Sequence, residues 1–138
     1  MSSMKRVQLV ILLLIVALFV LDTPALAAGA RSWDLVCVAV PPDRDAAASG
    51  FVKLSKVHGD LVHGYVGEVT VSCQGLTPGA TYLVQVWTGV AGGGKYVPAT
   101  KRGTAQVTFS QIRVQGIGLV WVVVSRAGDS PVTVLQSP

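Results

Sequence analysis

The chain has 138 residues, of which 11 are Lys or Arg and 7 are Asp or Glu, and its formal net charge is +4. This length corresponds to about one domain, and the scattered basic residues do not form the dense basic face of a nucleic-acid-binding protein. Glu68 is the only Glu, which makes the paired carboxylates of a glycosidase hard to assemble, and no G-x-S-x-G motif marks a serine nucleophile. We therefore expect a protein that is not an enzyme and that has no nucleic-acid partner.

The first 27 residues have the pattern of a secretory signal peptide. Two basic residues precede a run of 15 residues (7–21) that is apolar apart from Gln8, and an A-x-A cleavage motif ends at Ala27. The run is shorter than the roughly 18–20 apolar residues that span a bilayer, so the sequence favours cleavage over a retained membrane anchor. It predicts a signal peptide at 1–27 and a domain at 28–138 that is secreted, extracellular or periplasmic, with a membrane contact only if the segment stays uncleaved.

The remaining chain alternates apolar and polar residues in short segments, which turns containing Gly and Pro separate, as is typical of β-strands. The apolar residues of 104–114 change parity, which predicts a β-bulge near Ser110 and Gln111. A turn at 58–60 and an irregular stretch at 89–103 are also predicted, the latter because three consecutive glycines weaken a strand. The predicted strands number about seven and lie at residues 33–40, 51–57, 61–73, 81–88, 104–114, 119–124 and 132–135, with a short edge piece at 96–97.

This succession of short strands without a convincing helix predicts an all-β fold. Turn signals at near-regular spacing favour a single antiparallel β-sandwich. A small β-barrel is the alternative that the pattern leaves open.

Residues 75–86, GLTPGATYLVQV, resemble the L-x-P-G-x-x-Y-x-V-x-V segment of fibronectin type III and related immunoglobulin-like modules. The resemblance implies an immunoglobulin-like sandwich with a corner where Leu76 packs in the core and the Tyr82 hydroxyl bonds to the backbone. Pro78 and Gly79 suit the turn that precedes this tyrosine. Three predicted strands follow Tyr82, where fibronectin type III has two, so the strand order is not carried over. The resemblance implies no catalytic residue.

Cys37 and Cys73 are the only cysteines, and the predicted export places them in an oxidising compartment. Each lies on the apolar side of its predicted strand, as a bridge between two sheets requires. We therefore predict a disulfide between Cys37 and Cys73, with two buried free thiols as the alternative.

His58, Asp60 and His63 are close in sequence and carry side chains that suit zinc or copper. The chain has no third histidine and the spacing matches no ligand motif, so a solvated turn is the favoured interpretation. A small secreted or periplasmic metal-binding protein is the alternative function. Asp43 and Asp45 are weaker candidates for calcium, and we expect no cofactor.

Trp87 faces away from the core if the alternation of its strand is followed. The favoured interpretation is that the 89–103 stretch folds back over it. An exposed Trp87, with Lys95 and Tyr96 beside it, would form a surface that stacks on a sugar or anchors a partner protein. The leading hypothesis is thus an exported, non-catalytic binding or adhesion module for an extracellular protein or a glycan, with a structural role in the cell envelope as a further option. The core is expected to hold the other two tryptophans, Trp33 and Trp121.

Overall fold

The computed structural model describes residues 30–115 and 120–138, so the predicted signal peptide at 1–27 lies outside the described residues. Within these ranges no helix has the length and hydrophobicity needed to span a bilayer. The regular structure of the described chain consists of eight strands: β1 (Arg31–Cys37), β2 (Ser49–Asp60), β3 (Gly64–Gln74), β4 (Thr81–Trp87), β5 (Gly92–Pro98), β6 (Ala105–Val114), β7 (Trp121–Arg126) and β8 (Val132–Gln136).

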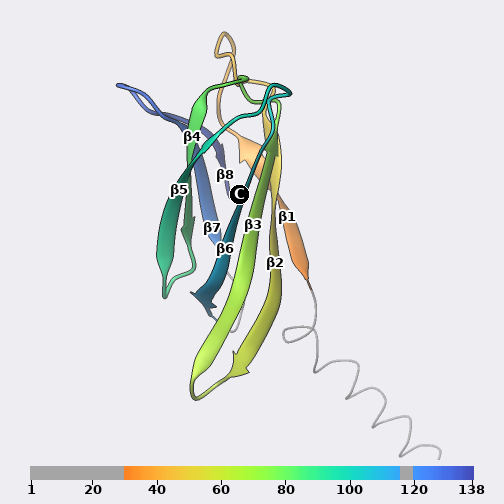
Figure 1. The fold of residues 1–138 in the computed structure, drawn as a ribbon, viewed down its shortest axis with the longest axis vertical. Coiled ribbons are helices and arrows are strands. Elements are labelled where there is room, and N and C mark those ends of the chain that lie inside the picture. Colours follow the sequence, from red (N-terminus) through yellow and green to blue (C-terminus); the bar gives the residue numbers. More distant parts are fainter. Residues whose placement is uncertain (1–29, 116–119) are drawn as a thin grey trace, which may run out of the picture.

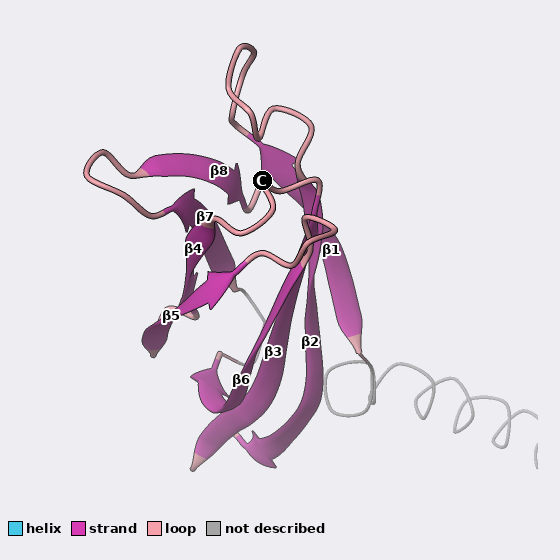
Figure 2. Ribbon diagram, turned by 45° about the horizontal axis from the view of Figure 1, so that its top comes forward, coloured by secondary structure: helices cyan, strands magenta, loops and turns pink. Residues whose placement is uncertain are grey.

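The strands form one antiparallel sheet in the order β5-β4-β7-β8-β1-β2-β3-β6. This sheet curls until its two edge strands, β5 and β6, approach each other, so that it nearly closes into a barrel (Figures 1 and 2). Lys95 of β5 bridges the two edges, because its Nζ donates a hydrogen bond to the carbonyl oxygen of Thr108 in β6 at 2.6 Å. The all-β prediction is confirmed, and the nearly closed sheet fits the barrel alternative.

Alternate side chains of the strands fill the inside of the curled sheet. Buried positions alternate with exposed or half-buried ones along β4 and at the start of β7. Valine is the commonest core residue, since its branched side chain suits a pleated surface. Every buried core residue lies between Leu35 and Leu135. A chain that starts at Ala28 therefore keeps the whole described core.

The predicted β-bulge is present in β6. Ser110 and Gln111 both lie opposite Glu68 of β3, so the register shifts by one residue at this point. Gln111 has a backbone φ of 52°, in the left-handed region that few residues adopt. The extra residue places Phe109 and Val114, which have opposite parity in the sequence, on the same buried side. The bulge prediction is confirmed.

β5 corrects the prediction of an irregular stretch at 89–103. Its three glycines (92–94) pair with the end of β4, and a Cβ added to Gly92 would lie 2.7 Å from Cε3 of the Trp87 ring. The indole on the neighbouring strand thus covers the glycine, as aromatic residues do for glycines at sheet edges. The predicted edge piece at 96–97 is confirmed as part of edge strand β5. The prediction is wrong for the glycines, because it considered them by themselves and not against the side chain of the partner strand.

β2 also runs further than predicted. Residues 58–60 belong to the strand and pair with β3, and the turn follows at 61–63. The carboxylate of Asp60 accepts hydrogen bonds from the backbone N–H groups of Val62 and His63, at 2.9 and 2.6 Å. An Asp side chain that bonds to the following backbone stabilises a turn, so the turn begins after Asp60 and the prediction at 58–60 is wrong.

The predicted disulfide is also wrong, since Cys37 and Cys73 are free thiols. Strand β2 separates their strands, because Gly50 pairs with Leu35 of β1 on one side and with Cys73 of β3 on the other. Two inter-strand spacings amount to about 10 Å, more than the roughly 7 Å between Cα atoms that a disulfide tolerates. Cys37 lies two residues further along β1, with its Sγ 3.5 Å from the carbonyl oxygen of Asp45.

Candidate functional site

One end of the sheet carries an opening that follows from the shortness of β8. This strand ends at Gln136 and pairs with β1 only at Val36 and Cys37. Ser137 then continues beside β7: its N–H donates to the carbonyl oxygen of Val122 at 2.9 Å, and its Oγ accepts the N–H of the same residue at 2.8 Å. The first residues of β1 and β7 therefore extend past the end of β8.

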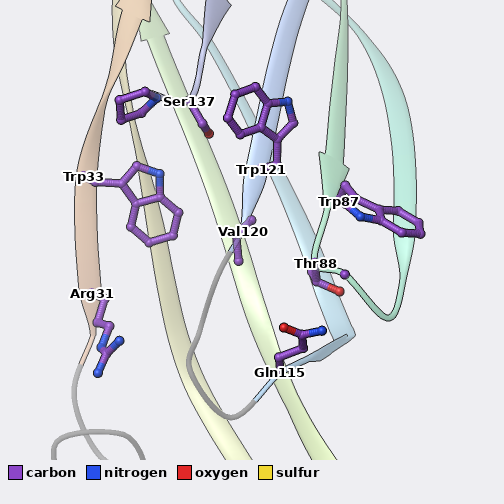
Figure 3. A pocket seen from close by; sticks show the side chains of 10 residues that line it. Arg31, Trp33, Trp87, Thr88, Gln115, Val120, Trp121 and Ser137 are labelled. Atoms are coloured by element: carbon purple, nitrogen blue, oxygen red, sulfur yellow. The ribbon is translucent and has the colours of Figure 1, made fainter.

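A pocket of about 530 Å³ lies at this end, between the start of β1, the start of β7 and the end of β4 (Figure 3). Its aromatic lining comprises all the tryptophans of the chain, one from each of these strands: Trp33, Trp87 and Trp121. We call it the tryptophan pocket. Polar groups join the aromatic ones, from Arg31, Thr88, Gln115 and Ser137.

The three indoles are not equally buried. Trp87 and Trp121 are direct partners in the β4–β7 ladder and expose 57% and 45% of their surface, whereas Trp33 is half-buried against the core. In Figure 3, Trp33 and Trp121 lie on opposite sides of the opening, and Trp87 lies further along, towards β5. The 89–103 stretch therefore does not bury Trp87 as expected. The placement of Trp121 in the core is likewise wrong, because directly paired residues emerge on the same face of a sheet.

Contacts at the ends of the strands hold the lining in place. The Thr88 hydroxyl donates a hydrogen bond to the carbonyl oxygen of Arg113 at 2.6 Å, which ties the end of β4 to β6. Beside it, Gly89 has a φ of 86°, and a Cβ at this position would lie 2.7 Å from Nε2 of Gln115. The pocket is thus built on strand ends, which position side chains more firmly than a free loop does.

The exposed tryptophan pair suits a ligand with an apolar surface. A smaller pocket of about 280 Å³ also lies against Trp87 and Trp121, over Gly92 of β5. An indole offers a broad apolar face with a single N–H donor at its edge. Two half-exposed indoles can therefore receive an apolar side chain of another protein or the apolar face of a sugar ring.

The structure does not unite Trp87, Lys95 and Tyr96 into the expected surface. Tyr96 is exposed on the same side of the sheet as Trp87, but its partner in β4 is Leu83, about 13 Å along the strand from Trp87. Lys95 lies opposite the buried Val84 and so points to the other side, where it bridges to β6. Of the three residues, Trp87 belongs to the pocket, and Lys95 belongs to the contact between the edge strands β5 and β6.

The candidates for a metal site are only partly brought together. Nδ1 of His63 lies 3.0 Å from Oδ2 of Asp60, whereas Nδ1 of His58 lies 3.0 Å from the carbonyl oxygen of Lys56. All three candidate side chains are exposed at the tip of the β2–β3 hairpin. In the described ranges, no group of three or more His, Cys, Asp or Glu side chains is arranged to hold a metal ion.

A buried charge cluster at the opposite end of the sheet was missed by the sequence analysis. Asp45 is fully buried, and its carboxylate accepts hydrogen bonds from the Tyr82 hydroxyl at 2.8 Å and from the Arg126 guanidinium. The N–H and the hydroxyl of Thr77 add two further bonds, at 2.9 and 2.8 Å. Arg126 also holds Asp43 through two hydrogen bonds of 3.0 and 3.1 Å. Asp43 and Asp45, the two candidate calcium ligands, are thus paired with the positively charged side chain of Arg126.

The cluster keeps both carboxylates ionised. Burial by itself raises the pKa of Asp45, but the hydrogen bonds from Tyr82, Arg126 and Thr77 outweigh it and hold this pKa below its ordinary value. The hydrogen bonds from Arg126 and from the backbone N–H of Asp45 lower the pKa of Asp43 to about 2. A fully bonded buried ion network of this kind fixes a structure, so we assign it to stability and not to ligand binding.

The corner that resembles fibronectin type III is part of the same end of the sheet. Leu76 and Tyr82 are both buried. The Tyr82 hydroxyl accepts the backbone N–H of Thr77 at 2.9 Å while it donates to the buried carboxylate. Gly79, which follows Pro78, has a φ of 76°, as the third residue of a type II turn requires.

Comparison of the chain with family models, with curated proteins and with solved structures finds no match. The function is therefore argued from the geometry of the sites themselves.

Proposed function

We propose that this protein is an exported, non-catalytic binding module whose partner, an extracellular protein or a glycan, docks in the tryptophan pocket. The observation that carries the proposal is that the three tryptophans of the chain come from three strands to line one pocket. Tryptophan is among the residues most enriched at binding hot spots, because a large rigid ring gains much contact area at little entropic cost. The predicted signal peptide supports export.

The chemistry of the pocket supports binding over catalysis. Arg31 is the charged residue of the described lining, which contains no His, Asp, Glu, Cys or Lys that could serve as a general base or nucleophile. The hydroxyl of Ser137 already accepts the backbone N–H of Val122. Polar groups of this kind orient a ligand. No observation in the described chain favours the metal-binding alternative at His58, Asp60 and His63.

We further infer that the fold is the small barrel and not the immunoglobulin-like sandwich. The unbroken order of hydrogen-bonded strands from β5 to β6 supports this, as does the Lys95 bridge between the two edges. The resemblance of residues 75–86 to fibronectin type III is then confined to the corner. The bond from the Thr77 N–H to the Tyr82 hydroxyl supports a corner role for this tyrosine.

The proposal is tested by binding of the chain 28–138 to an immobilised glycan array and to a phage-displayed heptapeptide library. We expect at least one probe class to bind, and its affinity to fall at least tenfold in Trp121→Ala, because loss of a hot-spot indole costs about 1.4 kcal/mol or more. Tyr96→Ala is the matched control, since Tyr96 is an exposed aromatic residue outside the pocket. Binding that is equal in wild type and Trp121→Ala, or absent for every probe, would contradict the proposal.

A further inference from the structure

The outer face of β1, β2, β3 and β6 carries a second pocket, of about 780 Å³, which shares no described lining residue with the tryptophan pocket. Leu35 follows Asp34 in β1 and Cys73 follows Ser72 in β3, and both Leu35 and Cys73 are buried. Residues next to them in the same strands therefore point outward. A row of four such side chains crosses the pocket in direct register, one from each strand: Asp34, Phe51, Ser72 and Gln106. Paired side chains of this kind stand about 5 Å apart.

Phe51 is the aromatic centre of this row. It belongs to β2, which has a strand on each side, and yet 43% of its surface is exposed. Asp34 and Ser72 stand directly beside it on the neighbouring strands. An apolar ring framed by polar groups suits a ligand that is apolar on its face and polar at its rim.

The polar groups around Phe51 are available to a ligand. Within the described chain, the side chains of Asp34, Ser72 and Gln106 form no hydrogen bond, whereas Gln74 at the margin of the pocket donates to Ser49 Oγ at 3.0 Å. A carboxylate accepts, and a hydroxyl and an amide both donate and accept. The row can therefore bond to several hydroxyl groups at once, each of which is itself both donor and acceptor.

The charge of the pocket selects against anions. Asp34 is the charged residue of the described lining, which contains no Lys, Arg or His. Among the described lining residues, a phosphorylated or acidic ligand would meet a like charge and no cation. A neutral ligand with many hydroxyl groups is not repelled by Asp34 and does not need a cation.

We propose that this outer pocket binds a neutral sugar ring, which stacks its apolar face on Phe51 and bonds its hydroxyl groups to Asp34, Ser72 and Gln106. It is a second site, and it goes beyond the proposed function because it stands on residues that the tryptophan pocket does not use. The sugar belongs to a neutral polysaccharide, since a chain of linked rings can extend along a pocket that crosses four strands.

Affinity electrophoresis of the chain 28–138 tests this site, with native gels that contain mannan, xylan, dextran or a soluble β-glucan, and with polygalacturonate as the acidic probe. We expect at least one neutral polysaccharide to retard the wild type. Phe51→Ala should raise the dissociation constant at least tenfold, and Asp34→Asn should raise it about threefold, because the amide keeps the size of the side chain and loses the charged acceptor. Gln106→Ala, at an exposed position of edge strand β6, should also weaken binding about threefold. Thermal unfolding of each variant establishes that it is folded.

The controls separate the two sites. Trp121→Ala and Tyr96→Ala should be retarded as strongly as the wild type. Retardation that is lost in Trp121→Ala and kept in Phe51→Ala would place the sugar in the tryptophan pocket, which overturns this inference and leaves the proposed function standing. Retardation by polygalacturonate alone, or by none of the neutral polysaccharides, would also overturn it.

Discussion

Trp87 and Trp121 face each other across the β4–β7 ladder, and about half of each indole stays exposed. At the other end of the same ladder, Tyr82 pairs with Arg126, and both bond to the buried carboxylate of Asp45. The two pairs are five residues, or about 17 Å, apart along the strands. One pair of strands therefore presents an aromatic surface at one end and is fixed by a buried ion cluster at the other.

The contact between Trp87 and β5 can be tested by adding a single methyl group. Gly92→Ala would place a Cβ 2.7 Å from the indole, which is closer than atoms pack, so the ring has to move. We expect a shift in tryptophan emission and a loss of about 1–2 kcal/mol in the free energy of unfolding, measured by urea titration.

Gly94→Ala is the matched control for this change. Gly94 lies on the same strand and face, but a Cβ there would meet nothing closer than 3.5 Å, which is ordinary contact. Identical emission and stability in the two alanine variants would show that Trp87 does not rest on Gly92.

The buried cluster should dominate the stability of the fold. Asp45→Asn removes the charge that the Arg126 guanidinium faces inside the protein, and we expect a loss of about 3 kcal/mol or more in the free energy of unfolding at pH 7. Asp129→Asn, at an exposed position of the β7–β8 turn, should stay within about 0.5 kcal/mol of wild type. Equal urea midpoints for the two variants would show that the cluster does not dominate the stability of the fold.

Stability should fall in acid as Asp43 and Asp45 take up protons. In the folded state the pKa of Asp43 is lowered to about 2, and the pKa of Asp45 lies below its ordinary value of 3.8. The unfolded chain therefore binds these protons first, so the stabilisation is complete above about pH 4 and is lost as the pH falls towards 2. Melting temperatures between pH 5 and pH 2 measure this, and Asp45→Asn should flatten the profile. A wild-type melting temperature that is constant over this range would rule the mechanism out.

The strands were largely predictable because alternation is a local property of the sequence. The bulge at Ser110 and Gln111 could be found in the same way, from a change of parity within one strand. Only the 96–97 part of β5 could be found in this way, since the glycine part of the strand depends on Trp87 of the partner strand, which covers Gly92. Trp121 lies in the continuous apolar run 119–124, which has no parity, so only its pairing with Trp87 determines which way it faces.

The sites depend on strand order, which alternation does not contain. The disulfide prediction assigned Cys37 and Cys73 to apolar faces, but it could not foresee that β2 lies between their strands. Asp45 and Arg126 are 81 positions apart, and no spacing rule connects them. The outer row around Phe51 was missed for the same reason, because its four residues come from four strands and meet only through their register.

The two thiols should be free in the purified protein. The intact mass of the chain 28–138 should not change on reduction, and a reductant should leave the melting temperature unchanged. Burial raises the pKa of the Cys73 thiol to about 11, and the thiolate is the reactive form, so Cys73 should react with a thiol reagent at pH 8 only after unfolding. A mass increase of two hydrogen atoms on reduction would show that Cys37 and Cys73 form a disulfide, and it would contradict this prediction.

The span of the Asp45 cluster has a kinetic consequence. The hydrogen bonds of the Asp45 carboxylate and of the Arg126 guanidinium join residues that are between 32 and 83 positions apart in the sequence. Contacts of this separation form late, because long loops have to close before any contact stabilises them. Before β7 is in place, the carboxylates of Asp43 and Asp45 cannot pair with Arg126, and they remain hydrated. We therefore expect the emerging chain to stay unfolded until β7 is available, so that, under the export proposed above, folding is completed only after this strand has crossed the membrane.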